Sequence, residues 1–377
     1  MKTICLSMIV KNESKAIRRL LASVKPIIDS WVICDTGSTD GTQAIIREEM
    51  KDIPGELLER PWVDFAYNRN VALESAREKA DYVLIVDADH VLVVLDSFDK
   101  ESLGQDFYLL KLSDHGSDHY RPMVVSNDPG WYWEGVIHET LLHPRRMQGE
   151  VLKDLYIECG SMDGCRSQDP KKYYKDAEVL EKAILKDPGN SRYYFYLAES
   201  YERVHEYEKA LKNYEIRAEM EGEPAETFWT LFSIGCMYEK LKMEPEMVIR
   251  SYCKAYEFDS TRAEPFHRLA IYLMNMECPS LGLMIAKFAL NLKTPNVLNT
   301  NYFPWVYNWG LNAVVGDCAM KLKIFDEAQG AYRKVLAVKE IPAEIRRRIE
   351  VNMRHIPVQR GNVPKNGGMK GSKYGFR

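Results

Sequence analysis

The first 150 residues alternate between strand-like and helix-like patterns, and most of the remaining chain has helical patterns alone. Apolar runs of strand length occur at residues 3–10, 31–34, 57–60 and 82–86. Helical spacing of apolar residues separates them at 13–24, 42–50 and 66–79. Strands that alternate with helices predict a mainly parallel sheet with helices on both faces. Ligands bind such sheets at the carboxyl ends of the strands.

Acidic loops follow two of the predicted strands. Asp35 begins the loop after the second strand, and Asp87 and Asp89 follow the fourth. Carboxylates at a strand end suit a hard divalent cation that keeps open positions for phosphate oxygens. An isolated pair of this spacing is also common in a solvated turn, so its meaning depends on the surrounding motifs.

The region from residue 171 to about 348 has an internal repeat. Tyr201 and Tyr238 are 37 residues apart, and Tyr238 and Tyr272 are 34 apart. This spacing resembles tetratricopeptide repeats, whose period is about 34 residues. An ordinary helical bundle is the alternative. In either case, stacked helix pairs offer an extended surface that can hold a partner or an acceptor.

Five motifs follow one another in the first 140 residues. They occupy residues 6–13, 32–42, 61–70, 87–89 and 133–139. In this order they resemble the family 2 glycosyltransferases of the GT-A fold, in the branch with a tetratricopeptide region after the catalytic domain. The resemblance implies an α/β, Rossmann-like GT-A domain with a mainly parallel sheet, followed by an all-α, tetratricopeptide-like repeat domain. The predicted divisions are a catalytic domain at 1–160, a linker at 161–170, repeats at 171–348 and a flexible basic tail at 349–377.

The resemblance also assigns nucleotide-binding roles. Val10, Asn12 and Glu13 would line the pocket for the base at the end of the first strand. Asp35 would accept a hydrogen bond from a ring N–H of the base, which in this family is typically uracil. Arg69 would face the pyrophosphate or the donor sugar, where a planar guanidinium offers a fork of donors to phosphate oxygens.

The same resemblance implies a metal site and a general base. Asp87 would contact the ribose or a metal-bound water, and Asp89 would bind Mn²⁺ or Mg²⁺, which stabilises the leaving diphosphate as a Lewis acid. His138 is either a third metal ligand or a residue hydrogen-bonded to the backbone. Glu139 is a candidate base for the acceptor, with Glu134 as its rival. Many family members have a Glu-Asp pair where this chain has His-Glu, so the base remains open between the two glutamates.

The function implied is a metal-dependent, inverting transfer of a sugar from a nucleotide sugar, with a UDP-sugar as the expected donor, to a macromolecular acceptor. A protein or peptide, a glycan and a modified nucleic acid all remain open as acceptors. The alternative is a catalytically inactive GT-A domain in a repeat-based binding scaffold. Asp35, Arg69, Asp87 and Asp89 are all present, which argues against a degenerate site.

Charge and cysteine content add three expectations. The formal net charge is −4, but residues 356–377 contain five lysines and arginines and no acid, which leaves −9 on residues 1–355. This tail is either a terminus without a role or an arm that grips a polyanion such as nucleic acid. The eight cysteines are scattered without a C-x-x-C pair, as in a reducing compartment, so a cytoplasmic location is expected. No apolar stretch approaches ~18 residues, so no membrane span is predicted.

Overall fold

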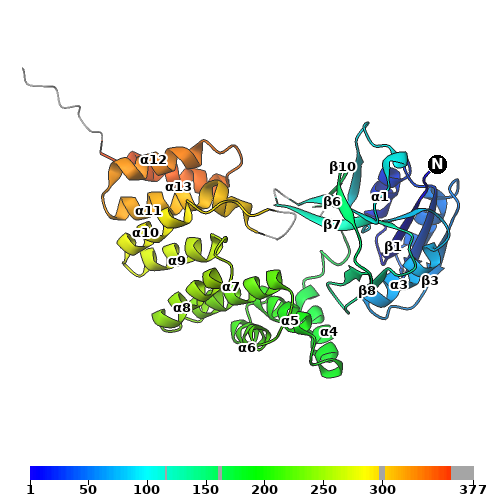
Figure 1. The fold of residues 1–377 in the computed structure, drawn as a ribbon, viewed down its shortest axis with the longest axis horizontal. Coiled ribbons are helices and arrows are strands. Elements are labelled where there is room, and N and C mark those ends of the chain that lie inside the picture. Colours follow the sequence, from blue (N-terminus) through cyan, green and yellow to red (C-terminus); the bar gives the residue numbers. More distant parts are fainter. Residues whose placement is uncertain (115–116, 160–163, 297–301, 358–377) are drawn as a thin grey trace, which may run out of the picture. The chain divides into compact units, whose positions relative to one another are not determined.

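The computed structural model describes residues 1–114, 117–159, 164–296 and 302–357 (Figure 1). The chain divides into two compact units. One comprises Met1–Phe266 with Leu292–Pro304, and the other comprises His267–Asn291 with Trp305–Arg377. The predicted domain boundaries at residues 160, 170 and 348 stay predictions. Part of the predicted linker, and residues 358–377 of the predicted basic tail, lie outside the described residues.

The first unit begins with the predicted α/β arrangement. Its parallel strands are β1 (Ile4–Val10), β2 (Ser30–Asp35), β3 (Gly55–Glu59) and β4 (Tyr82–Ile85). The helices between them are α1 (Ile17–Val24), α2 (Thr42–Glu49) and α3 (Phe65–Ala76). Each expected strand and helix in this stretch is present, with its ends shifted by a few residues.

The second half of the sheet is not mainly parallel. It is built from β5 (Val91–Val94), β6 (Phe107–Asp114), β7 (Ser117–Ser126) and β10 (Gly149–Glu158), with the short 3₁₀ helix η1 (Lys100–Ser102) between β5 and β6. The strand order is β3-β2-β1-β4-β7-β6-β10-β5, and β7 runs antiparallel to both β4 and β6. A separate two-stranded sheet pairs β8 (Tyr132–Glu134) with β9 (Thr140–Leu142). The α/β class is therefore confirmed, with a mixed sheet.

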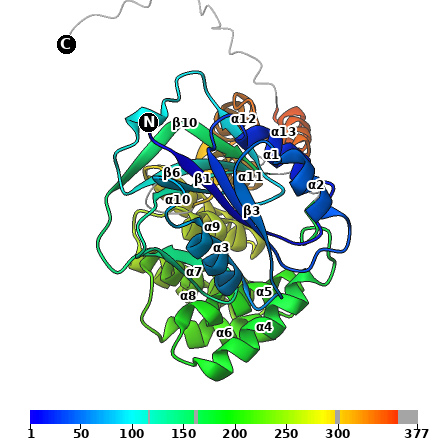
Figure 2. The ribbon, with the colours of Figure 1, turned by 90° about the vertical axis from the view of Figure 1, so that its right-hand side faces the viewer.

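The two faces of the sheet follow the period-2 alternation of its strands. Ile4, Leu6 and Met8 of β1 are buried in one core cluster with side chains of α1 and α2. Cys5 lies in a second cluster with side chains of α3, such as Leu73. In Figure 2, β1 and β3 accordingly lie between the α1–α2 pair and α3. The helices therefore pack on the two faces of the sheet, and the connecting loops lie at the ends of the strands.

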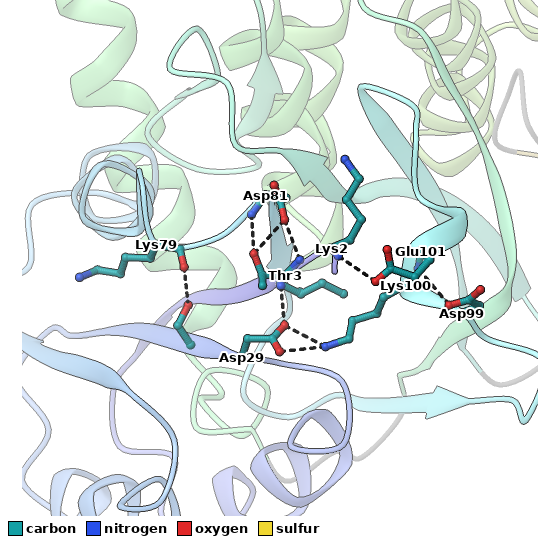
Figure 3. Close-up of polar contacts among 10 residues, drawn as sticks. Lys2, Thr3, Asp29, Lys79, Asp81, Asp99, Lys100 and Glu101 are labelled. Atoms are coloured by element: carbon teal, nitrogen blue, oxygen red, sulfur yellow. Dashed lines mark hydrogen bonds and ion pairs between the residues drawn. The ribbon is translucent and has the colours of Figure 1, made fainter.

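A polar network holds the amino end of β1 (Figure 3). The Asp81 carboxylate accepts hydrogen bonds from the N–H and the hydroxyl of Thr3, at 2.8 and 3.0 Å. The Asp29 carboxylate accepts from the N–H of Ile4 at 2.8 Å and forms an ion pair with Lys100 at 2.9 Å. These bonds satisfy backbone groups at the start of β1, and they lie at the opposite end of the strand from the acidic loops.

The remaining described elements are helices. In sequence order they are α4 (Lys172–Lys186), α5 (Ser191–Arg203), α6 (Tyr207–Ala218), α7 (Pro224–Lys240), α8 (Pro245–Phe258), α9 (Glu264–Asn275), α10 (Pro279–Ala289), the π-helix η2 (Val306–Gly310), α11 (Leu311–Lys321), α12 (Phe325–Leu336) and α13 (Ala343–Arg354). No helix among the described residues is long and apolar enough to span a membrane.

A glycine-to-tyrosine contact recurs within each unit. In the first unit, a Cβ on Gly235 of α7 would lie 2.7 Å from the ring of Tyr252 of α8. In the second unit, a Cβ on Gly316 of α11 would lie 2.4 Å from the ring of Tyr332 of α12. Both tyrosines are fully buried, so each helix pair closes in the same way: an aromatic ring lies against a helix that has no side chain at that point. The predicted helical-repeat character of this region is confirmed.

Candidate active site

Two loops meet at the carboxyl ends of β1 and β2. Val10 pairs with Asp35 in the parallel register, and its carbonyl accepts a hydrogen bond from the N–H of Thr36 at 2.9 Å. Asn12 has a positive φ of 57°, and its side-chain oxygen accepts from the N–H of Thr39 at 2.8 Å. The loop after β1 is thus bonded to the loop after β2, as the strand register requires.

Glu13 continues the same contact. Its N–H donates to the hydroxyl of Thr42, at the start of α2, at 2.9 Å. Its carboxylate accepts from the N–H of Cys165 at 3.2 Å, which ties this loop to the segment before α4. The structure therefore brings together the four predicted base-pocket residues Val10, Asn12, Glu13 and Asp35.

Asp35 ends β2 and has an exposed fraction of 1%. Its Oδ1 accepts three hydrogen bonds: from the N–H groups of Gly37 and Ser38, both at 2.9 Å, and from the side-chain amide of Gln43 at 3.1 Å. Its Oδ2 is buried and has no hydrogen-bond partner among the described residues. A buried carboxylate oxygen without a donor is costly, so this atom is suited to accept an N–H from a ligand.

Arg69 lies on α3 and joins two carboxylates. Its Nη2 donates to Asp87 Oδ1 at 2.7 Å, and its Nε donates to Glu139 Oε1 at 2.5 Å. The guanidinium also lies over the ring of Trp133, 5.1 Å from its centroid. The exposed fractions of the Arg69 and Glu139 side chains are 10% and 11%, whereas that of Asp87 is 44%. Three of the predicted site residues are thus in direct contact.

The charges in this triad set its protonation. Burial would raise the pKa of the Asp87 carboxyl, but the charge and hydrogen bond of Arg69 outweigh it and lower that pKa to about 2. Burial would lower the pKa of the Arg69 guanidinium, but Asp87 and Glu139 together raise it above its ordinary value. Asp87 is therefore a carboxylate and Arg69 a cation at any physiological pH.

A cavity of about 390 Å³ opens beside this triad. Its lining residues come from the strand ends, from the segment 133–141 and from the first helices: Phe65, Arg69, Ile85, Asp87, Arg121, Pro122, Met123, Trp133, Ile137, His138, Glu139, Thr140, Leu141, Arg166, Lys172, Arg192 and Tyr196. Of the ten predicted site residues, the lining includes Arg69, Asp87, His138 and Glu139. Glu134 is exposed at the end of β8 and is not part of it.

The segment that carries His138 and Glu139 is held by helical residues. The His138 ring stacks on that of Tyr196 of α5, with centroids 4.0 Å apart and an interplanar angle of 11°. Arg192 donates from Nη2 to the His138 carbonyl at 3.1 Å. Ile137 is buried in the hydrophobic cluster formed mainly by α4 to α7. The predicted base therefore occupies a segment that is packed into the first helical repeat.

His138 is uncharged in this setting. Partial desolvation by the surrounding side chains lowers the pKa of its imidazole to about 3, although the residue itself is exposed, and the positive charges of Arg166, Arg121, Lys172 and Arg192 act in the same direction. An imidazole in its neutral form can bind a metal ion. The described residues nevertheless contain no group of three or more His, Cys, Asp or Glu side chains placed to hold one.

Asp89 lies against the backbone at Gly164. A Cβ on Gly164 would lie 2.4 Å from its Oδ2, so the glycine leaves room for this carboxylate. The carbonyl of Asp89 accepts from Arg19 at 3.4 Å. Mg²⁺ in phosphate-transferring sites is typically held by only one or two carboxylates, with phosphate oxygens and waters as the other ligands. Asp89 fits that kind of site, whereas a complete metal site made of protein ligands alone is not present among the described residues.

The cavity residues that were not assigned a site role from the sequence include Arg121, Arg166, Lys172, Arg192 and Tyr196. The structure places Arg121 in the β6–β7 hairpin and places Arg192 and Tyr196 in α5. A signal for Arg166, Lys172 and Arg192 does exist, because basic residues are spaced along 166–192, before and at the starts of the first two helices. That signal does not indicate which of them face the strand ends.

Comparisons with known proteins support this two-part organisation. Residues 5–93 match the family model described as Glycosyl transferase family 2, and residues 179–212 match one described as Tetratricopeptide repeat. A TPR repeat-containing protein of Synechococcus elongatus is 39% identical over 95 residues, which are 25% of this chain and 22% of the relative. The SPbeta prophage-derived glycosyltransferase SunS of Bacillus subtilis is 24% identical over 222 residues, which are 55% of this chain and 51% of the relative.

Solved structures of TPR proteins also match this chain at low identity. A thermophilic TPR protein of Thermus thermophilus aligns at 13% identity with a TM-score of 0.37, over 48% of this chain and 91% of that protein. This chain spans about a fifth of the Synechococcus relative and about half of the Bacillus relative.

Proposed function

Because the chain carries a Glycosyl transferase family 2 domain at its N-terminus and a tetratricopeptide repeat in its helical region, we propose that it is a metal-dependent, inverting glycosyltransferase. The donor is a nucleotide sugar, with a uracil base. The acceptor is a macromolecule bound by the cavity and by the helical repeats beside it. Among the acceptors left open by the sequence, a protein or peptide is favoured by the repeats, which commonly bind proteins.

The observation that carries the proposal is the unpartnered Oδ2 of Asp35. Uracil presents one ring N–H between two carbonyl groups, and a carboxylate oxygen accepts that N–H well. The other oxygen of Asp35 is already fixed by Gly37, Ser38 and Gln43, so the free oxygen is held in one direction before a ligand arrives. Val10, Asn12 and Glu13 border the same loop and would complete the pocket for the base.

The proposed chemistry uses the residues around Arg69. Glu139 would accept the proton of the acceptor nucleophile, which then attacks the anomeric carbon from the face opposite the leaving diphosphate. Arg69 holds the Glu139 carboxylate and the Asp87 carboxylate on either side of its guanidinium. Asp89 would hold Mn²⁺ or Mg²⁺, which supplies charge stabilisation for the departing nucleoside diphosphate. The cavity beside Glu139 gives the acceptor group a place next to the base.

The test is a donor screen with the purified full chain. We expect release of UDP from one or more UDP-sugars in the presence of Mn²⁺ or Mg²⁺, and loss of that activity after treatment with EDTA. The variant Asp89→Asn should lose at least about 100-fold in rate, because removal of a charge-stabilising group from a transition state costs several kcal/mol. Circular dichroism should show that the variant is folded.

Two results would contradict the proposal. If no nucleotide sugar binds in the presence of either metal, the domain is an inactive part of a binding scaffold. If Asp89→Asn keeps full activity, the metal assignment is wrong even if transfer takes place. Mass analysis of candidate peptides and glycans incubated with the active donor would then identify the acceptor.

A further inference from the structure

The cavity beside Glu139 has a cationic wall formed by Arg121, Arg166, Lys172 and Arg192. We propose that this wall binds an anionic group, a carboxylate or a phosphate, on the acceptor. The inference rests on the proposed function, because it names the class of molecule that the proposed transferase would modify.

Cations clearly outnumber acids in the cavity lining. Its positively charged side chains are Arg69, Arg121, Arg166, Lys172 and Arg192, and its negatively charged side chains are Asp87 and Glu139. This is a formal excess of three positive charges in a cavity that partly excludes water. A concave site lined by one sign of charge concentrates ligands of the opposite sign.

Two of these cations form ion pairs with carboxylates that are not part of the cavity lining. Arg166 forms an ion pair with Asp176 at 2.5 Å, and Arg192 forms one with Glu226. Within the part of the chain that the structure describes, Lys172 and Arg121 have no carboxylate within ion-pair distance. These two side chains therefore have no direct ion-pair partner among the described residues, and an anionic ligand could supply one.

The protonation of neighbouring groups agrees with an uncompensated positive field. Burial and the charge of Arg166 lower the pKa of the Lys172 ammonium from its ordinary value, and the charges of Asp176 and Asp89 offset this only in part. The same wall contributes to the low pKa of His138 described above. A bound anion would offset this repulsion, because opposite charges a few ångströms apart attract strongly where water is partly excluded.

The position of the cavity favours the acceptor over the donor diphosphate. Among the described residues, its lining includes Glu139, the proposed base, together with Arg69 and Asp87, which are expected to face the donor. It includes none of the base-pocket residues Val10, Asn12, Glu13 and Asp35, and not the proposed metal ligand Asp89. The nucleophile of the acceptor must reach the base, so the acceptor occupies the part of this cavity beside Glu139. The four cations of the wall then select acceptors with a negative charge near the nucleophile.

The experiment measures anion binding by calorimetry with the full chain. The probes are inorganic phosphate and, for a carboxylate source, D-glucuronate, each titrated with and without saturating UDP and Mn²⁺. We expect binding of at least one probe whose affinity is not reduced by UDP. Lys172→Gln and Arg121→Gln should each weaken it by about tenfold, or about 1.4 kcal/mol, and Lys172→Arg should retain it. Lys182→Gln removes an exposed charge from the same helix outside the cavity and should leave the affinity unchanged.

The outcomes separate this inference from the function on which it rests. If neither probe binds, or if Lys172→Gln and Arg121→Gln bind as well as the natural chain, the cationic wall is not an anion site. If UDP competes with the probe, the wall serves the donor diphosphate and the acceptor assignment is wrong. If a probe binds but UDP does not bind at all, the proposed glycosyl transfer fails. In that case the acceptor assignment fails as well, although the anion site exists.

Discussion

The unpartnered oxygen of Asp35 makes the base pocket testable by a single substitution. In Asp35→Asn the side-chain carbonyl oxygen can keep the three hydrogen bonds now accepted by Oδ1 from Gly37, Ser38 and Gln43. The amide NH₂ then replaces Oδ2, the atom proposed to accept the uracil N–H. The fold should therefore survive, while the ligand would meet a donor where it needs an acceptor.

The loss in affinity can be estimated from these contacts. A hydrogen bond to a charged group contributes about 1.5–3 kcal/mol, and each buried donor left without an acceptor costs a further ~1–3 kcal/mol. The total is at least about 2.5 kcal/mol, which corresponds to about 60-fold or more in the dissociation constant of UDP. The free energy of unfolding should change by less than about 1 kcal/mol, because one unpartnered buried polar atom replaces another.

The assay is calorimetric titration of UDP and CDP in the presence of Mn²⁺. Cytosine has an acceptor nitrogen where uracil has the ring N–H, so Asp35→Asn should also reverse the preference between the two nucleotides. Asp52→Asn, an exposed carboxylate in the loop after α2, is the matched control and should bind UDP as the natural chain does. If Asp35→Asn binds UDP within about threefold of the natural chain, Oδ2 does not accept the base N–H and the reasoning fails.

Three further predictions concern the segment 133–139. Glu139→Gln should lower the transfer rate by about 10²–10⁴-fold, which is the usual contribution of a general base. Glu134→Gln, which lies outside the cavity, should retain most of the transfer rate. Equal losses of rate in the two variants would refute the choice of Glu139 as the base. Because the pKa of His138 is lowered to about 3 from an ordinary 6.5, the unfolded chain binds a proton there before the folded chain does. Stability should thus fall as pH drops from about 6.5 towards 3, by more than in His138→Gln, as urea denaturation can measure. Ile137→Ala should lower the free energy of unfolding by about 2–4 kcal/mol, because it removes a buried side chain. The control Ile216→Ala should lower it by less than about 1 kcal/mol, because Ile216 is 38% exposed. Similar losses in the two variants would refute the packing of Ile137 against the first helices.

The first four strands and three helices were predictable because each carries its own hydrophobic period. The mixed second half of the sheet was not, because β5 is short and because β7 and β10 pair with β4 and β5, which are distant in sequence. The proximity of Asp35 to Val10 followed from two neighbouring parallel strands. By contrast, the pairing of Arg69 with Glu139 spans 70 residues and depends on a turn with positive φ at Gly135 and His138. Neither feature has a local periodic signal.

The shared hydrophobic cluster has a consequence for modular evolution. The family model ends at residue 93 and the repeat model begins at residue 179, as if two independent pieces had been joined. Yet Phe65 and Ile137 pack among the side chains of the first helices. Attachment of the α/β part to a different repeat array would expose these side chains and release the segment that carries Glu139. Under the proposed function, exchange of the repeats would therefore change the active site itself, and a lineage that acquires a new acceptor would have to alter both parts together.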